Sequence, residues 1–395
     1  MEATVQTAKP TVERDQRLAQ FGPGPGGGYD SRRWLALPVV LSATFMSLFD
    51  VFVVNVAAPS IQHDLHASSA TLQLLVAGYS FSYAAGLVTG ARLGDLYGRR
   101  RLFIFGLLLF ASASLLCGVA PTAGLLLAGR LAQGLGAAAM VPQVLALATV
   151  NFPPEERPRV FSLFGATVGI GTVAGQVLGG VFLKLDILGL GWRPIFLVNV
   201  PIGITAALLA RRLLPESRPP LADRLDLVGV GLLSTGIGGV IVPLVLGREV
   251  HWAGWTFASL VAGVALLGAF LVWERWLGQR GGHPLLPLEL FEHRAFSIGL
   301  LVNLGFFAFF GSLLLTLTVF LQEGLHDTPL RAGLTFGPLG IAFALSSLAG
   351  RRLQQRFGTA TIIAGTATSL AGVVGLTLLV HWVGVSLTSL DLAPV

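Results

Sequence analysis

Two ionisable residues, Asp50 and Arg130, lie deep inside otherwise apolar stretches of this 395-residue sequence. Asp50 is the only acid well inside a long apolar run, and Arg130 is the only one of the 26 Lys and Arg residues within such a run. A charged side chain in these surroundings costs several kcal/mol unless it is paired or faces water. A carboxyl group there can bind and release a proton, and an arginine can pair with it. These residues are the first candidates for chemistry.

Eleven apolar runs must position these side chains. Hydrophobic residues make up 53% of the sequence and charged residues 12%, against roughly 25% charged residues in a soluble domain. Many runs reach the roughly 20 residues that a helix needs to cross a bilayer. The predicted helices cover about 34–58, 72–92, 102–120, 122–149, 159–183, 194–213, 226–247, 254–274, 295–321, 332–350 and 360–384. The sequence therefore predicts an all-α polytopic membrane protein.

The placement of basic residues predicts an orientation. Assigning the connecting segments to alternate sides puts 21 of the 26 Lys and Arg residues on the side that holds the N-terminus. By the positive-inside rule, the N-terminus is cytoplasmic and the protein is a multi-pass protein of the cell (inner) membrane. At 1.5 Å per residue, Asp50 lies about 12–14 Å and Arg130 about 12 Å from the outer ends of their predicted helices. These depths are compatible with contact between the two side chains.

An internal repeat predicts how the chain is divided. GARLGDLYGRR (90–100) recurs 260 residues later as GRRLQQRFGTA (350–360), with Gln355 in place of Asp95. We therefore expect a flexible tail over 1–33, a six-helix repeat over 34–214, two inserted helices over 215–294, and a partial second repeat of three helices over 295–395. On this count the chain stops about three helices short of two complete repeats.

Two short stretches combine charge or glycine in a regular pattern. The loop after the second predicted helix contains one acid, Asp95, among arginines. Leu93 and Gly98 lie on either side of Asp95, and Arg99 and Arg100 follow. Asp95 can pair with an arginine there, or cap a neighbouring helix, in one conformation.

The fifth predicted helix contains GTVAGQVLGGVF (171–182). Gly171, Gly175 and Gly179 recur every four residues along one ridge, and Gln176 and Gly180 lie beside them. This spacing predicts a close helix contact on which the two repeats rock, although ordinary packing of small residues requires the same glycines.

The chain resembles the major facilitator superfamily, in its fourteen-helix drug:proton antiporter branch. LLLAGRLAQGLGAAA (125–139) is similar to the helix 4 signature and LFDVFVVNVAAPSI (48–61) to the helix 1 signature; 91–102 resembles the loop 2–3 signature. Stretch 171–182 resembles the antiporter signature, with Gln176 where Pro is usual. The resemblance implies a conformational latch at the loop. It also implies a proton-coupling site and substrate cavity, formed by Asp50, Asn55, Arg130 and Gln133.

The function implied is secondary transport, namely proton-coupled export of amphipathic or cationic drugs, antibiotics or secondary metabolites by alternating access. The expected partners are a small-molecule substrate, protons and the lipid bilayer. The proton gradient supplies the energy, with no cofactor. The chain has no nucleotide-binding loop, no catalytic or metal-spaced motif and no basic–aromatic pattern for nucleic acid. An enzyme is therefore not expected.

Two alternatives remain open at this stage. The same fold could carry one specific metabolite, or the chain could be a truncated, inactive paralogue that acts as a membrane interaction partner. The sequence leaves the oligomeric state undetermined.

Overall fold

The computed structural model describes residues 32–218, 225–248 and 250–383. Within this part the chain is helical, without strands, and eleven helices are long and apolar enough to cross a membrane. The predicted fold class and number of spanning helices are therefore confirmed. The tail predicted over 1–33 lies almost wholly outside the described residues.

The first six-helix unit, as we name it here, runs from α2 to α8. It contains α2 (Arg33–Asp64), α3 (Ser69–Tyr97), α4 (Arg99–Gly118), α5 (Ala123–Asn151), α6 (Arg157–Leu185), η1 (Ile187–Gly189), α7 (Pro194–Leu197) and α8 (Asn199–Leu213). The inserted hairpin follows as α9 (Leu227–Leu246) and α10 (Gly254–Gln279). The remaining elements are η2 (Leu288–Glu292), α11 (Arg294–Val319), a π-helical turn η3 (Phe320–Gly324), α12 (Pro329–Thr335), α13 (Gly337–Phe357) and α14 (Ala360–Val383).

Some helices extend further than the apolar runs that predicted them. α2 continues to Asp64 instead of about residue 58, and α10 continues to Gln279 instead of about residue 274. Hydropathy falls at the first charged residue, whereas backbone hydrogen bonding continues until a cap or turn interrupts it. Ser68 is such a cap, because its hydroxyl accepts a hydrogen bond from Thr71 N at 3.1 Å where α3 begins.

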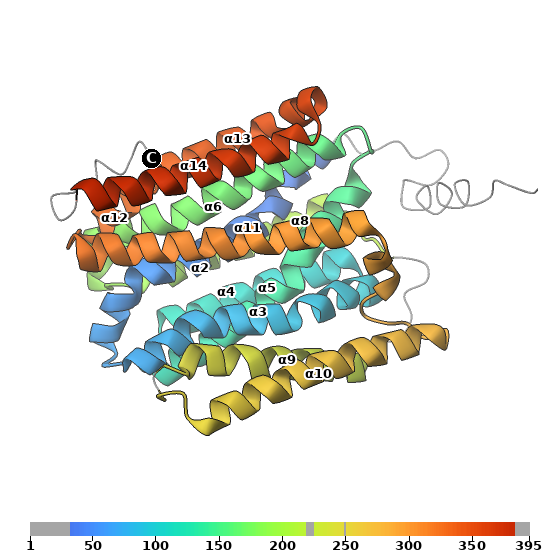
Figure 1. Ribbon diagram of the computed structural model, residues 1–395, viewed down its shortest axis with the longest axis horizontal. Coiled ribbons are helices and arrows are strands. Elements are labelled where there is room, and N and C mark those ends of the chain that lie inside the picture. Colours follow the sequence, from blue (N-terminus) through green and yellow to red (C-terminus); the bar gives the residue numbers. More distant parts are fainter. Residues whose placement is uncertain (1–31, 219–224, 249, 384–395) are drawn as a thin grey trace, which may run out of the picture.

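Two groups of helices flank the first six-helix unit (Figure 1). The α9–α10 hairpin lies along α3, where Ser234 Oγ donates to Ala85 O at 3.1 Å. On the other side α12 and α13 pack against α6, where Ser347 Oγ donates to Ser162 O at 3.0 Å, and α14 packs on α13. The inserted hairpin and the later helices therefore contact different helices of the first unit.

The glycine ridge of α6 packs against α2. Ideal Cβ atoms placed at Gly171, Gly175 and Gly179 would all contact α2, the closest lying 2.8 Å from the backbone O of Phe49. The close contact predicted from the spacing is present, but it joins two helices of the same unit. The ridge does not face the later helices, because α12 and α13 pack along another face of the same stretch of α6, where Gly169 meets Phe343 and Val173 meets Gly340.

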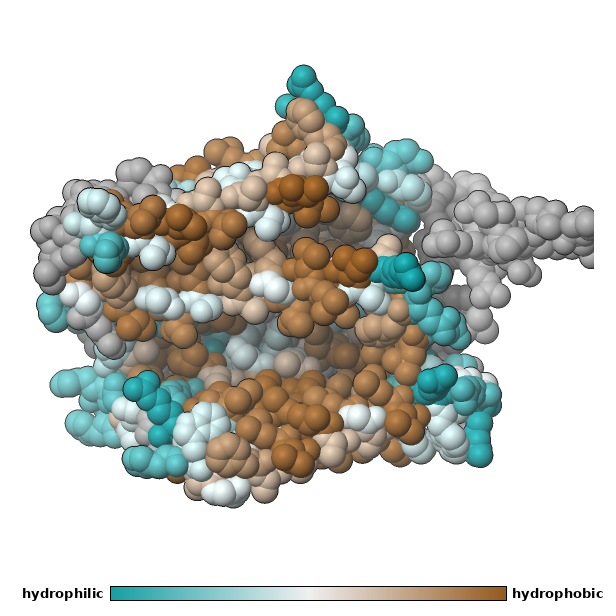
Figure 2. Space-filling model, in the orientation of Figure 1, coloured by the Kyte–Doolittle hydropathy of each residue, from teal (hydrophilic) through white to brown (hydrophobic). Residues whose placement is uncertain are grey.

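On the face shown in Figure 2, apolar side chains cover most of the middle, and polar side chains gather toward the two ends. This is the surface expected of a helical bundle in a bilayer.

At one end Arg33 donates two hydrogen bonds to Glu156, at 2.8 and 2.9 Å, and these hold the pKa of Glu156 below its usual value. Any stability from this pair is present above the unfolded-state pKa of Glu156 and is lost as the pH falls through the folded-state pKa.

Candidate functional site

Asp50 and Arg130 form an ion pair in the interior of the first six-helix unit. Asp50 on α2 is 0% exposed and Arg130 on α5 is 1% exposed, and Arg130 Nη1 donates to Asp50 Oδ2. The contact agrees with the compatible depths predicted from helix geometry. Each side chain supplies the charge that makes burial of the other tolerable.

Gln133 extends the ion pair into a network. It lies one turn after Arg130 on the same face of α5. Its Nε2 donates to Asp50 Oδ1 at 2.9 Å and to Ser114 Oγ on α4 at 2.7 Å, and its Oε1 accepts from Arg130 Nη1 at 3.0 Å. Asn199, the first residue of α8, also donates to Asp50 Oδ1, at 3.3 Å. The carboxylate therefore receives hydrogen bonds from three side chains.

Helix α3 completes the enclosure of Arg130. The Nε atom of Arg130 donates to Leu75 O at 3.2 Å, and its guanidinium lies 4.7 Å from the centre of the Tyr79 ring. The Tyr79 hydroxyl is 2.6 Å from Ser47 Oγ, one turn before Asp50 on α2. A cation–π contact and a backbone contact from α3 therefore also hold Arg130 in place.

The structure brings together three of the four side chains predicted for this site. Asn55 does not join them, because it lies five residues after Asp50, about 140° away around an ideal helix. Among the described residues it donates no hydrogen bond to the network. Asn199, Ser114 and Tyr79 were not predicted. Asn199 lies within GWRPIFLVNVPIG (191–203), a stretch typical of the antiporter branch. That motif could have identified Asn199 as a candidate site residue.

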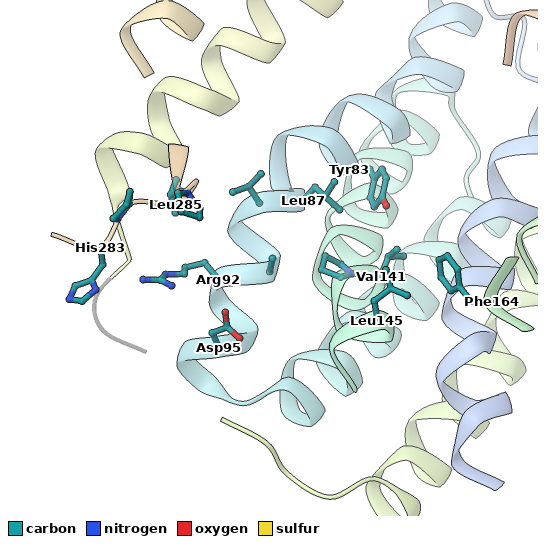
Figure 3. Close-up of a pocket in the computed structure, with 14 residues that line it drawn as sticks. Tyr83, Leu87, Arg92, Asp95, Val141, Leu145, Phe164, His283 and Leu285 are labelled. Atoms are coloured by element: carbon teal, nitrogen blue, oxygen red, sulfur yellow. The ribbon is translucent and has the colours of Figure 1, made fainter. Parts of the chain in front are cut away.

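A cavity of about 790 Å³ lies at the end of the bundle that carries the 99–101 arginines (Figure 3). α3, α5, α6 and the segment before η2 line it, with side chains that include Tyr83, Leu87, Arg92, Asp95, Val141, Leu145, Phe164, His283 and Leu285. Its walls are mostly apolar, and Arg92 extends from α3 toward the side where His283 lies. Tyr83 stacks on Tyr79 with ring centres 6.2 Å apart. Two adjacent tyrosines therefore separate the cavity from Arg130.

The loop between α3 and α4 is tied to the segment after α8. Asp95 accepts hydrogen bonds from Arg99, its i+4 neighbour, at 3.0 and 3.3 Å. Glu216 accepts from the backbone N of Arg100 at 3.1 Å, so Glu216, and not Asp95, caps the N-terminus of α4. Gly98 has φ +104° at this turn, and a Cβ there would meet the Glu216 carboxylate. Leu93 is half-buried in the preceding turn.

Replacing Glu216 with alanine is expected to destabilise the start of α4 by about 1 kcal/mol, the usual effect of losing an N-terminal cap. Faster amide hydrogen exchange in residues 99–102 is the measurement. Asp95→Asn serves as the matched control, because the Asp95–Arg99 ion pair lies near the surface and does not cap α4, and such pairs contribute about 0.2–1 kcal/mol. An equal or larger effect of Asp95→Asn would contradict the assignment of Glu216 as the cap.

Gln176 and Gly180 of the α6 motif are both buried. The Gln176 amide is 1% exposed, and neither its oxygen nor its nitrogen has a hydrogen-bond partner within the described residues. α12 packs directly over this turn, since a Cβ at Gly333 would overlap the backbone of Gln176. Gln176 therefore places a polar group in the contact between the first unit and the later helices.

The described part of the chain contains no group of three or more His, Cys, Asp or Glu side chains that could hold a metal ion.

Fold and site together define a multi-pass α-helical membrane protein with an acid–arginine pair buried among its spanning helices. A family model described as Major Facilitator Superfamily matches residues 40–229. The chain is 39% identical to a "Probable actinorhodin transporter" of Streptomyces coelicolor and 39% identical to "Puromycin resistance protein pur8" of Streptomyces alboniger. These alignments cover 95% and 89% of this chain, and 66% and 68% of the relatives.

A third relative, "Multidrug resistance protein Stp" of Mycobacterium tuberculosis, is 35% identical over 84% of this chain and 60% of its own length. The chain therefore spans about two thirds of the length of the curated relatives it matches. On this evidence, the chain belongs to the major facilitator superfamily, whose members are membrane transporters and not enzymes.

Proposed function

We propose that this chain works in proton-coupled export of amphipathic or cationic small molecules, antibiotics among them. The observation that carries the proposal is the fully buried Asp50, held by Arg130, Gln133 and Asn199 inside apolar helices. The names of the relatives support export of antibiotics and drugs as the substrate class. We assign the chain to the fourteen-helix antiporter branch on its motifs.

Protonation of Asp50 provides the coupling step. An ionised Asp50 keeps Arg130 in place, whereas a protonated Asp50 leaves the guanidinium buried without its countercharge. Rotation of the Arg130 side chain toward water or substrate then becomes favourable, because it solvates the unpaired charge. The protonation state of Asp50 therefore biases the helix arrangement. A bound cationic substrate competes with the proton for the same carboxylate. The proton gradient is the energy source.

The cavity beyond Tyr83 is the proposed substrate route. Its volume of about 790 Å³ falls within the roughly 300–1,000 Å³ of sites that hold drug-sized ligands. Apolar walls with few fixed polar groups accept varied molecules. Tyr83 and Tyr79 stack between this cavity and Arg130, so a bound molecule reaches the ion pair only when these two rings move apart.

We place the N-terminus and the cavity mouth on the cytoplasmic side of the cell membrane, because 21 of the 26 basic residues lie on that side.

The α3–α4 loop is proposed as the conformational latch. The Asp95–Arg99 pair and the Glu216 cap hold it to the segment after α8 in this conformation. Release of these contacts accompanies the opposite conformation.

Asp50→Asn is expected to abolish transport driven by a pH gradient, because asparagine keeps the hydrogen-bonding shape but cannot carry a proton. The measurement is efflux of puromycin and of ethidium from vesicles that contain the protein, with an imposed gradient. Glu292→Gln, a change at an exposed acid, is the control and should leave efflux unaltered. Undiminished efflux in Asp50→Asn would remove Asp50 from the coupling step. Absence of gradient-driven efflux of both probes in the unaltered protein would contradict drug export itself.

A further inference from the structure

A second pair of acidic side chains lies at the base of the inserted hairpin, outside the Asp50 network. Asp226 precedes α9 and caps it, since its Oδ1 accepts from Val228 N at 3.1 Å. Glu274 lies near the end of α10 and is only 1% exposed. Neither residue belongs to the first six-helix unit, and neither is used in the function proposed above.

The two carboxyl groups border one small space. An ideal Cβ at Gly229 would lie 2.7 Å from Glu274 Oε1 and would also contact Asp226 Oδ2. Both oxygens therefore point at the same position on α9, which only a glycine leaves open. The side chains of Asp226 and Glu274 lie within hydrogen-bonding reach of each other.

The available donors satisfy all but one of these carboxyl oxygens. Trp273 Nε1 donates to Asp226 Oδ2 at 2.8 Å, and Leu286 N donates to Glu274 Oε2 at 2.8 Å. Glu274 Oε1 is buried and accepts no hydrogen bond from any described group. A buried acceptor without a donor is costly, and a buried negative charge without a partner is more so.

Among the described residues, no positively charged group forms an ion pair with either carboxyl group. Asp226 is the charged group that acts on Glu274, and the backbone N–H groups of Leu285 and Leu286 supply the other polar contacts. Just after α10, the Arg280 guanidinium carbon lies 4.1 Å from the centre of the Trp276 ring. From the segment before η2, His283 lines the cavity with Arg92.

We propose that Asp226 and Glu274 form a proton-binding site, in which a carboxylic acid and a carboxylate share one proton. A buried Glu274 carboxylate and the half-buried Asp226 carboxylate beside it repel each other when both are ionised. One proton removes the repulsion, gives the unsatisfied Glu274 Oε1 a hydrogen, and forms an O–H···O hydrogen bond to a charged acceptor. The shared proton therefore supplies the hydrogen-bond donor that no described protein group offers to Glu274 Oε1.

The site also controls one wall of the cavity. Glu274 holds the backbone of Leu286, and Leu285 packs beside Gly229 while it lines the cavity (Figure 3). Loss of the shared proton sets two negative charges against each other at this attachment. The 283–287 segment is then less firmly held, so the shape of the cavity responds to a proton bound far from Asp50 in the sequence.

The test uses the protein in lipid nanodiscs in an Asp50→Asn background, so that Asp50 does not contribute. Infrared difference spectra at neutral pH should show a protonated-carboxyl C=O band that disappears in both Glu274→Gln and Asp226→Asn. Both replacements keep the side-chain shape, and asparagine remains a good helix cap. Glu289→Gln, at an exposed acid near the same segment, is the control that should keep the band.

Amide exchange of the 285–286 backbone gives the second readout. Its protection should fall roughly tenfold or more as the pH rises through the titration of the pair, the factor expected for losing a hydrogen bond to a charged group. Glu274→Gln should keep the protection and remove its pH dependence. A band unchanged in both variants, or an unaltered pH dependence in Glu274→Gln, overturns the proposal. A response to Na⁺ or Ca²⁺ at fixed pH without a response to pH overturns it in favour of a cation site. If one variant fails to fold, the other and the unaltered protein still decide.

Discussion

Replacing Arg130 with methionine is expected to lower the free energy of unfolding by about 3–5 kcal/mol, the usual loss when one member of a buried ion pair is removed. Methionine fills much of the same volume, so the loss arises from charge more than from a cavity. Asp50, 0% exposed, keeps only the neutral donors Gln133 and Asn199. Denaturation of the purified protein, followed by helix content, is the measurement.

The double variant Asp50→Asn/Arg130→Met separates charge from packing. It should be more stable than Arg130→Met alone, because no unpaired charge stays buried. Arg193→Met is the matched surface control. Its ion pair with Asp64, at 2.9 Å, is partly exposed at both ends, and such pairs contribute about 0.2–1 kcal/mol. A double variant less stable than Arg130→Met would show that the arginine acts mainly by packing.

Replacing Gly136 with valine is expected to lower the free energy of unfolding by about 3 kcal/mol or more. Overpacked cores typically lose about 1–3 kcal/mol. An ideal Cβ at Gly136 would lie 2.7 Å from Phe110 N and 3.1 Å from Gly106 O. Those atoms belong to the backbone of α4 and cannot rotate away, so α4 and α5 must separate. The separation would stretch the hydrogen bond of 2.7 Å between Gln133 and Ser114, one turn along the same helices.

Transport and unfolding should therefore both be impaired in Gly136→Val, and both are measurable on one preparation. Gly124→Ala is the control on the same helix, because an added Cβ there meets nothing within 4 Å. Alanine in a helix is favoured over glycine by roughly 0.5–1 kcal/mol, so this control should show no loss. A Gly136→Val protein as stable as the control would mean that the α4–α5 contact readily opens.

The depth of the ion pair could be predicted from the sequence, but its full set of partners could not. Rise per residue fixes how far along a helix a residue lies, which is why Asp50 and Arg130 were expected to meet. Direction around the helix decides which neighbours share a site. Asn55 is close to Asp50 in sequence and turns away from it, whereas Asn199 comes from a helix nearly 150 residues later.

The contacts of charged residues near helix ends could not be predicted from the sequence either. Hydropathy ended the eighth predicted helix at about residue 274, so Glu274 was not counted among the buried acids. In the structure the helix continues, and the 283–287 segment folds back to cover that side chain. Glu216 was missed for a similar reason, because nothing in its local sequence shows that the segment after α8 returns to the start of α4.

The sequence alone determined the class of the protein and the number of its spanning helices, because apolar runs of this length have no other stable place than a bilayer. It also determined which ionisable residues lie within the apolar runs. Only the tertiary structure decided what each of them touches: Glu216 at the α4 cap, α2 under the α6 glycines, and Asp226 beside Glu274. The physical reason is that hydropathy and rise are local properties of the chain, whereas a buried polar group is satisfied by whichever distant helix packs against it.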